Sequence, residues 1–454
     1  MKIVVIGCDK IGSSVVELLI KDGHEICVVD IESKRVQRAC DIYEITGIVG
    51  NGASYDVQKK AGVDKCDVMI ACTNIDEVNI LCCLVAKDLG ALHTVIINNN
   101  EDYYEQIENL RERFNIDLLV CPEKEAATEV SRVLRFPSAL QVERFAEGKM
   151  ELIDVIIPDE SEFVGHTIAD NHGKNYPDVQ ICAVERGGEV FIPSGNTVLE
   201  AGDRLSLASN GSGIVKYMKR TGLYQSRIKR VLILGGTNSA LYLAKIISGI
   251  GIEVTIIESD FERCKYLSEA LPKAYIIHGS DNDYELMRNE GLTDADAFVA
   301  FTSNNEKNII ASLYALNKNV PKVITAVDEK NLFSVVGEID LGSVVSQNVL
   351  TATRILHFVK SLQDARDAGS KLDHIFTIAG GRAFVLEFSV TESFGKAGIP
   401  LKDLTIRTDT FIAMIIRDNK AIIPRGNDVI LVGDKVVIVT LNESIDTMNE
   451  VLDK

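Results

Sequence analysis

Two segments of the chain align with each other without a gap. Residues 3–35 read IVVIGCDKIGSSVVELLIKDGHEICVVDIESKR, and residues 231–263 read VLILGGTNSALYLAKIISGIGIEVTIIESDFER. Gly7 aligns with Gly235, and an acid follows each glycine by 23 residues (30 − 7 and 258 − 235). A strand that ends in glycine, a helix, and a second strand that ends in an acid are the parts of a mononucleotide-binding Rossmann half.

The repeat continues through the rest of both halves. AGVDKCDVMIACTNIDEVNI at residues 61–80 matches EGLTDADAFVAFTSNNEKNI at residues 290–309. Further on, IPSGNTVLEAGDRL at residues 192–205 matches IPRGNDVILVGDKV at residues 423–436. The chain is therefore a tandem duplication.

Each half changes its periodicity once. It begins with short runs rich in Val and Ile that alternate with helical stretches, in the first half at residues 3–7, 26–30, 45–49, 68–72, 94–98 and 117–121. Apolar strands that alternate with helices indicate a parallel doubly wound sheet. Later residues read as strands joined by hairpin turns, with Gly187-Gly188 in the first half and Asp418-Asn419 in the second.

We therefore predict an α/β chain with two Rossmann-like doubly wound parallel-sheet domains, each followed by a small β-rich α+β domain. The boundaries are predicted at residues 1–139, 140–226, 227–371 and 372–454. A length of 454 residues agrees with this number of domains, because a domain holds about 100–200 residues.

The composition argues against several classes of protein. The 48 basic and 66 acidic side chains give a net charge of −18, which repels nucleic acid. The longest run without a charged residue, Val231–Ala244, is shorter than the roughly 20 apolar residues of a membrane span. The amino terminus lacks the pattern of a cleavable signal peptide, so we expect a cytosolic protein.

The cysteines and histidines show no metal-binding pattern. None of the ten cysteines forms a C-x-x-C motif, and several lie inside apolar runs, so we expect reduced, buried thiols. The seven histidines are scattered without i, i+3 or i, i+4 pairs. We therefore predict no metal site.

Both glycine-rich turns depart from the G-x-G-x-x-G pattern. The first reads Gly7-Cys8-Asp9-Lys10-Ile11-Gly12 and the second Gly235-Gly236-Thr237-Asn238-Ser239-Ala240. Asp9 is unfavourable beside a pyrophosphate unless Lys10 or a cation offsets its charge, whereas Thr237 adds only bulk and a hydroxyl. We therefore expect tighter nucleotide binding at the second turn. A scaffold that has lost its ligand in one copy is the alternative.

Other polar residues follow the remaining strands of each predicted sheet. Thr73-Asn74 and Thr302-Ser303 end the fourth strands, where open α/β sheets bind ligands. Gly50-Asn51-Gly52 follows the third strand at the same edge. The next residues, Asp76-Glu77, are also explained as an acidic helix start.

These motifs, in tandem and in this order, resemble the TrkA family, the peripheral regulatory subunits of Trk potassium-uptake systems, which consist of two RCK (regulator of potassium conductance) units. The resemblance covers essentially the whole chain. It implies binding of NAD(H) and/or ATP/ADP. Carried over by position, the ligand residues are Gly7, Cys8, Asp9, Lys10, Ile11, Asp30, Asn51, Thr73, Asn74 and Asn98 in the first unit, and Gly235, Gly236, Thr237, Asn238, Ser239, Glu258, Thr302 and Ser303 in the second.

The resemblance also implies a function and partners. We expect a cytoplasmic regulatory subunit, peripheral at the inner face of the cell membrane, that gates a Trk-type potassium-conducting membrane subunit through ligand-dependent rearrangement of a homo-oligomeric ring (dimer or tetramer). We predict no catalytic residues, because His166 and His172 of the first β-rich domain have no counterparts in the second. The alternatives are an NAD-dependent oxidoreductase and a soluble redox or nucleotide sensor with another target.

Two helices beyond the sixth strands, at residues 123–135 and 348–360, have apolar faces. These faces are available either to a neighbouring unit or to their own domain. The first arrangement would give the ring its contacts.

Overall fold

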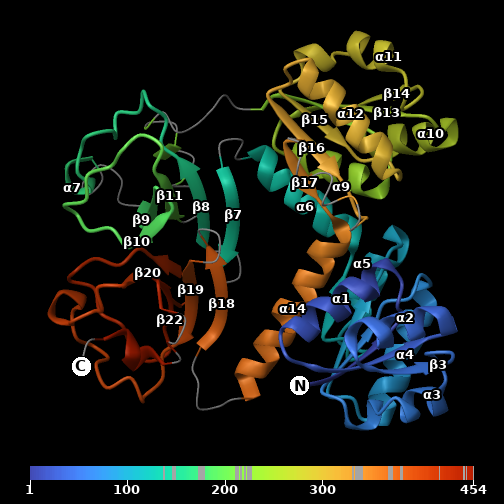
Figure 1. The fold of residues 1–454 in the computed structure, drawn as a ribbon, viewed down its shortest axis with the longest axis horizontal. Helices are drawn as coiled ribbons and strands as arrows, with labels where there is room; N and C mark the ends of the chain where they lie inside the picture. The colour runs from blue at the N-terminus through green and yellow to red at the C-terminus, as the bar shows by residue number, and fades with distance from the viewer. Residues whose placement is uncertain are drawn as a thin grey trace. The chain divides into compact units, whose positions relative to one another are not determined.

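The computed structural model describes residues 1–135, 139–145, 150–171, 179–209, 214, 217–218, 221, 228–329, 332, 341–366, 372–378, 382–418, 420–442, 445 and 447–452. The chain forms two compact units, Met1–Leu134 with Ile228–Val359 and Arg135–Arg227 with Lys360–Lys454 (Figure 1). Each unit takes one part from each half of the duplication, and the four domain boundaries remain a prediction. Among the described helices, none has the length and apolar character that a membrane crossing requires.

The first unit contains two parallel sheets of six strands. The sheet of the first half has the order β3-β2-β1-β4-β5-β6. Its strands are β1 Lys2–Ile6, β2 Glu25–Asp30, β3 Thr46–Val49, β4 Val68–Ala71, β5 His93–Ile97 and β6 Leu118–Val120. Its helices are α1 Lys10–Lys21, α2 Ser33–Tyr43, α3 Tyr55–Lys60, η1 Val63–Lys65, α4 Asp76–Leu89, α5 Glu101–Leu110 and α6 Pro122–Arg135.

The second sheet repeats this topology as β14-β13-β12-β15-β16-β17. Its strands are β12 Arg230–Leu234, β13 Glu253–Glu258, β14 Tyr275–His278, β15 Ala297–Ala300, β16 Lys322–Ala326 and β17 Ser343–Val345. Its helices are α9 Asn238–Gly249, α10 Phe261–Ala270, α11 Tyr284–Asn289, η3 Leu292–Asp294, α12 Asn305–Asn317 and α14 Gln347–Arg366. The predicted doubly wound fold is confirmed, and each strand order reverses between the first and fourth strands, where such sheets bind ligands.

Helix α6 packs on the sheet of the other half. Its buried residues share one core cluster with Val231 of β12, Leu241 of α9 and Val254 of β13; they are Ala126, Ala127, Val130 and Leu134. Figure 1 shows α6 (teal) among elements of the second half. The apolar face of α6 is therefore covered by the second half of the same chain, and the predicted contact between the members of a ring stays a prediction.

Helix α14 also contacts the first half. Its Phe358 ring lies 6.4 Å from the ring of His93 in β5, nearly perpendicular to it. The two helices therefore tie the Rossmann domains of one chain together.

The second unit contains two antiparallel sheets of five strands, with the orders β10-β9-β11-β8-β7 and β18-β19-β22-β20-β21. The first comprises β7 Ala139–Phe145, β8 Met150–Ile156, β9 Val179–Arg186, β10 Glu189–Phe191 and β11 Arg204–Ser209, with α7 Ile168–Asn171. The second comprises β18 Leu372–Ile378, β19 Ala383–Ser389, β20 Thr410–Arg417, β21 Lys420–Ile422 and β22 Lys435–Thr440, with η5 Leu401–Asp403 and η6 Met448–Val451. Leu152 and Cys182 share a core cluster with Val385 and Met414, so the sheets of the two halves pack on each other.

The motif shared by residues 192–205 and 423–436 has a structural role. Its aspartates, Asp203 and Asp434, are buried and accept hydrogen bonds from Nε of Arg186 at 2.7 Å and of Arg417 at 2.8 Å. The hairpin at Gly187-Gly188 is confirmed between β9 and β10. Strands β20 and β21 pair as predicted, although Asn419 of their turn lies outside the described residues.

Candidate functional site

Both glycine-rich turns begin with a glycine that no other residue replaces without strain. Gly7 has a φ of +104°, and a Cβ there would lie 2.6 Å from the carbonyl oxygen of Cys72. Gly235 has a φ of +96°, and its Cβ would lie 2.7 Å from the carbonyl oxygen of Phe301. Each turn therefore crosses close to the end of the fourth strand of its sheet, and the helix that follows points its N-terminus at that edge.

The residue at the middle position caps the following helix differently in the two copies. Thr237 is the N-cap of α9; its hydroxyl accepts from the backbone N–H of Ala240 at 3.4 Å and donates to the Phe301 carbonyl at 2.9 Å. Asp9 is the N-cap of α1 but makes no capping hydrogen bond, and its Oδ1 is buried without a partner. The first turn therefore holds an uncompensated acceptor where a phosphate would approach.

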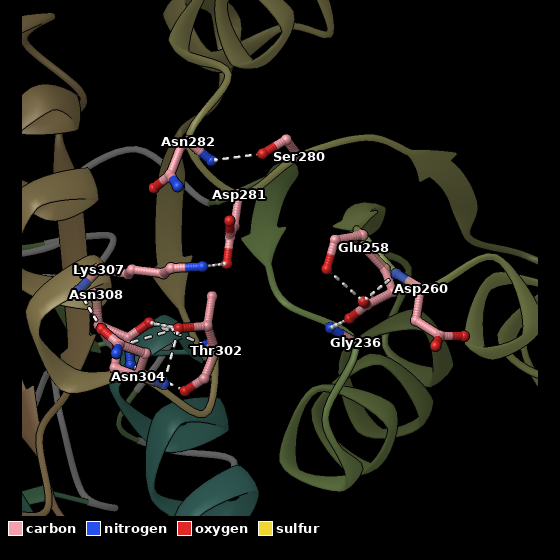
Figure 2. Close-up of polar contacts among 11 residues, drawn as sticks. Gly236, Glu258, Asp260, Ser280, Asp281, Asn282, Thr302, Asn304, Lys307 and Asn308 are labelled. Atoms are coloured by element: carbon pink, nitrogen blue, oxygen red, sulfur yellow. Dashed lines mark hydrogen bonds and ion pairs between the residues drawn. The ribbon is translucent and has the colours of Figure 1, made fainter.

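The predicted ribose-binding acids lie beside their turns in both copies. Oδ2 of Asp30 accepts from the backbone N–H of Cys8 at 2.7 Å, and Oδ1 accepts from that of Glu32 at 2.9 Å. In the second copy Oε2 of Glu258 accepts from the backbone N–H of Gly236 at 2.6 Å, and Oε1 accepts from that of Asp260 at 2.7 Å (Figure 2). Asp30 is buried, whereas the longer Glu258 is half-buried, so the second carboxylate is more accessible to a ligand.

An arginine that sequence reasoning missed follows the acid by five residues in each copy. Arg263 donates from Nε to the Gly236 carbonyl at 2.6 Å and from Nη2 to Oδ1 of Asn238 at 2.8 Å. Arg35 instead pairs with Glu32 at 2.9 Å and with Asp30 at 3.8 Å. Only the second turn therefore carries its arginine directly on the glycine-rich backbone. The alignment of Arg35 with Arg263 at the end of the repeated segments is the signal that could have revealed them.

The threonines that follow the fourth strands are braced by asparagines. Thr73 donates from its backbone N–H and from Oγ1 to Oδ1 of Asn79, at 2.8 and 2.7 Å. Thr302 and Asn308 repeat these contacts at 3.0 and 2.7 Å (Figure 2). Asn79 and Asn308 are buried, and their alignment in the matching segments 61–80 and 290–309 was the available signal. Asn74 and Ser303 are exposed beside them.

The acid that starts α4 is more than a favourable helix-start charge. Asp76 is buried, and its Oδ1 accepts from the backbone N–H of Asn99 at 2.9 Å. In the second copy Oδ1 of Asn305 accepts from the backbone N–H of Asp328 at 2.9 Å. The acid of one copy therefore aligns with the amide of the other, Asp76 with Asn305 and Asp328 with Asn99. In both copies the hydrogen bond links the residues that follow the fourth and fifth strands.

Three predicted residues of the first copy are placed less favourably for a ligand. Both amide atoms of Asn98 are buried without a partner, and Val327 occupies the matching position in the second copy. Asn51 is exposed, but its Oδ1 accepts from the backbone N–H of Ala53 at 3.0 Å. Burial raises the pKa of the Cys8 thiol to about 12, so the thiol is neutral at physiological pH.

The cysteines and acids form no metal centre among the residues that the structure describes. All ten cysteines are free; eight are buried as expected, whereas Cys27 and Cys40 are half-buried.

A cleft of about 270 Å³ opens at the turn of the second copy. Its walls combine Thr237, Asn238 and Ser239 of the turn with residues that end or follow the fourth, fifth and sixth strands of the second sheet; these are Phe301, Thr302, Ser303, Asn305, Asn308, Ala326, Asp328, Gln347 and Asn348. Two further lining residues, Lys10 and Glu123, come from the first half. Burial raises the pKa of the Glu123 carboxyl, with the nearby acids Asp76 and Asp328 adding to the effect.

The groups around the second turn suit a nucleotide better than those around the first, and tighter binding there stays a prediction. It offers a half-buried acid anchored for ribose hydroxyls, hydroxyl and amide groups around the cleft, and a turn without an acidic side chain. The cleft approaches the roughly 300 Å³ of the smallest ligand pockets. A nucleotide would place its phosphates there and its ribose at Glu258.

Comparison with known proteins gives matches along the whole chain. The TrkA-N domain matches residues 3–122 and 231–347, and the TrkA-C domain matches residues 152–222 and 385–453. The Trk system potassium uptake protein TrkA homolog 1 of Methanosarcina mazei is 29% identical over 97% of each chain. The TrkA homolog of Archaeoglobus fulgidus is 28% identical over 99% of this chain and 100% of its own.

Solved structures with the same fold include RCK proteins. The crystal structure of the GsuK RCK domain has a TM-score of 0.62 at 15% identity and covers 96% of this chain and 92% of its own. The GsuK channel bound to NAD has a TM-score of 0.63 at 14% identity and covers 97% of this chain and 76% of its own. At these identities the likeness concerns the fold.

Proposed function

The chain belongs to the TrkA family, with TrkA-N and TrkA-C domains in tandem, and from this premise we propose that it is a nucleotide-binding regulatory subunit of a Trk-type potassium-uptake system. Its ligands are NAD(H) and/or ATP/ADP. The observation that carries the proposal is the second glycine-rich turn, where Glu258 is anchored by two backbone N–H groups beside a polar cleft. The names of relatives that match nearly the whole of this chain support the potassium system.

The proposed location is the inner face of the cell membrane, on a potassium-conducting subunit. A net charge of −18 suits the excess of Lys and Arg in cytoplasmic loops of membrane proteins. Gating requires at least two arrangements of a homo-oligomer, a dimer or tetramer, that bind nucleotide with different affinities. Nucleotide exchange then changes the potassium flux.

Calorimetry on the full chain with ADP, ATP and NADH tests the binding step. Glu258→Ala removes a charged hydrogen-bond acceptor, so we expect roughly a tenfold to hundredfold loss of affinity at the second site. Glu253→Ala is the matched control, because Glu253 is exposed at the other end of β13. Equal affinities of both variants would contradict the proposed site.

Flux measurements on the protein reconstituted with a Trk-type membrane subunit test the regulatory step. We expect the nucleotide-dependent change of flux to disappear in a double variant, Asp30→Ala with Glu258→Ala. A flux response that survives after nucleotide binding is lost would overturn the mechanism.

The oxidoreductase alternative predicts a different result. The proposed regulator binds NADH without consuming it, so NADH absorbance stays constant across a panel of small carbonyl substrates. His166 of the first β-rich domain is described and His172 lies outside the described residues. Turnover that depends on either histidine would favour the enzyme.

A further inference from the structure

The cleft at the second turn contains a residue of the first turn. Lys10 is the first residue of α1 and directly follows Asp9, yet it lines the cleft together with Thr237, Ser239 and Thr302. Its Nζ forms an ion pair with Oε1 of Glu329 at 3.3 Å. Glu329 lies three residues after β16 and next to Asp328, another lining residue. Lys10 thus spans from the first Rossmann domain to the ligand edge of the second.

The charges of the cleft give this lysine a role. Among the lining residues Lys10 is the only cation, while Glu123 and Asp328 are acids. The remaining polar groups are neutral amides and hydroxyls, which do not offset the charge of a diphosphate. Since α1 places Lys10 at the mouth of the cleft with two-thirds of its side chain exposed, its ammonium group is free to exchange Glu329 for a phosphate.

We infer that Lys10 is a phosphate-binding residue of the second nucleotide site rather than of the first. The inference rests on the proposed nucleotide-binding function and adds to it the composite nature of the site. The resemblance to the TrkA family assigned Lys10 to the first site by its position, but its ion pair is with Glu329 of the other half. A phosphate bound at the second turn therefore competes with Glu329 for Lys10, and ligand binding in one domain changes an ion pair to the other.

The test is calorimetry with ADP on the full chain, because α6 completes the core of the second domain. Asp30→Asn weakens the first site, so the affinity measured in this variant is that of the second site. Glu258→Gln weakens the second site, so the affinity measured in that variant is that of the first site. Lys10→Gln should weaken ADP binding at the second site about two- to fivefold, the range of an exposed ion pair, and should leave the first site unchanged. It should also flatten the salt dependence of second-site affinity.

Two further variants separate the role of Lys10 from a general effect. Lys21→Gln, at the other end of α1 and paired with Glu17, is the control and should leave both sites unchanged. Glu329→Gln should strengthen the second site by releasing Lys10, and this gain should shrink when Lys10→Gln is also present. Thermal unfolding of each variant checks the fold.

The outcomes are distinct. Loss of affinity only at the first site, or at neither site, overturns the inference while leaving the proposed function in place. If the chain binds no ADP even with Lys10 present, the proposed nucleotide site is wrong and the inference falls with it. The inference is also contradicted if Glu329→Gln strengthens ADP binding at the second site by the same factor when Lys10→Gln is present.

Discussion

The first turn places Asp9 at the N-cap of α1 with one buried oxygen unpaired, whereas the second places Thr237 at the N-cap of α9 with its hydroxyl bonded on two sides. The backbones are alike, since both begin with a buried glycine at positive φ against the fourth strand. The difference shows that duplication preserved the scaffold of the turn while the groups that meet a ligand diverged. Sites with one fold can therefore differ in affinity.

The largest expected effect tests the shared scaffold. Gly7→Ala and Gly235→Ala should each lower the free energy of unfolding by about 3 kcal/mol or more, because a left-handed backbone is strained and the Cβ overlaps a carbonyl. Gly23→Ala is the control: its φ is +81°, but nothing lies within 4 Å of the added Cβ, so about 1–2 kcal/mol is expected. Urea denaturation measures all three. Similar losses of unfolding free energy in all three variants would show that the overlap of the added Cβ with a carbonyl at Gly7 and Gly235 contributes little.

Asn98 offers a second difference between the copies. Its two amide atoms are buried without partners where the second copy has Val327. Asn98→Val should therefore raise the free energy of unfolding by about 1–3 kcal/mol, and Val327→Asn should lower it by a similar amount. A destabilised Asn98→Val protein with weaker nucleotide binding would instead support the ligand role predicted from the family.

A smaller effect is expected from copying the second turn into the first. Asp9→Thr should supply the missing capping bond and remove a carboxylate near the phosphate position. We expect the free energy of unfolding to rise by about 1 kcal/mol. We also expect several-fold tighter ADP binding at the first site, measured with Glu258→Gln present. Thr237→Asp is the reciprocal variant and should weaken the second site. If both variants leave the ADP affinities unchanged, the N-cap residues do not cause a difference in affinity between the two sites.

The smallest effect concerns Glu123 in the cleft. Burial raises its pKa, so its ionised form is disfavoured in the folded state, and this cost is present at neutral pH. Glu123→Gln should raise the melting temperature by a few degrees at pH 7 to 8. The gain should disappear as the pH falls through the raised pKa and the native glutamate becomes protonated. Glu129→Gln, on the same helix and paired with Arg132, is the control.

The sequence predicted the architecture well because the relevant signals are local and repeated. Apolar runs located the strands, the glycines at 7 and 235 marked the turns, and the acids at 30 and 258 lie beside those turns as expected. Periodicity also distinguished the parallel sheets from the antiparallel ones. The repetition of each pattern in both halves of the duplication reinforced these predictions.

The composition of the cleft was beyond the reach of sequence reasoning. Lys10 was assigned to the first site by its position in the family motif, but the packing of the two halves brings it to Glu329, 319 residues later. Arg263 lies beside the second turn, and although its alignment with Arg35 was visible, its contact with the Gly236 carbonyl depends on how α10 packs. Such contacts follow from tertiary packing, which local patterns do not encode.

The position of α6 has a consequence for how the chain is made. The four buried residues of α6 leave the ribosome before the strands on which they pack, since Arg135 precedes the start of β12 at Arg230 by 95 residues (230 − 135). At roughly 5–20 residues per second, translation of that interval takes about 5 to 20 seconds. During this time the nascent chain carries an apolar helix face whose covering surface has not yet been synthesised, and a chaperone that binds such faces has its opportunity then.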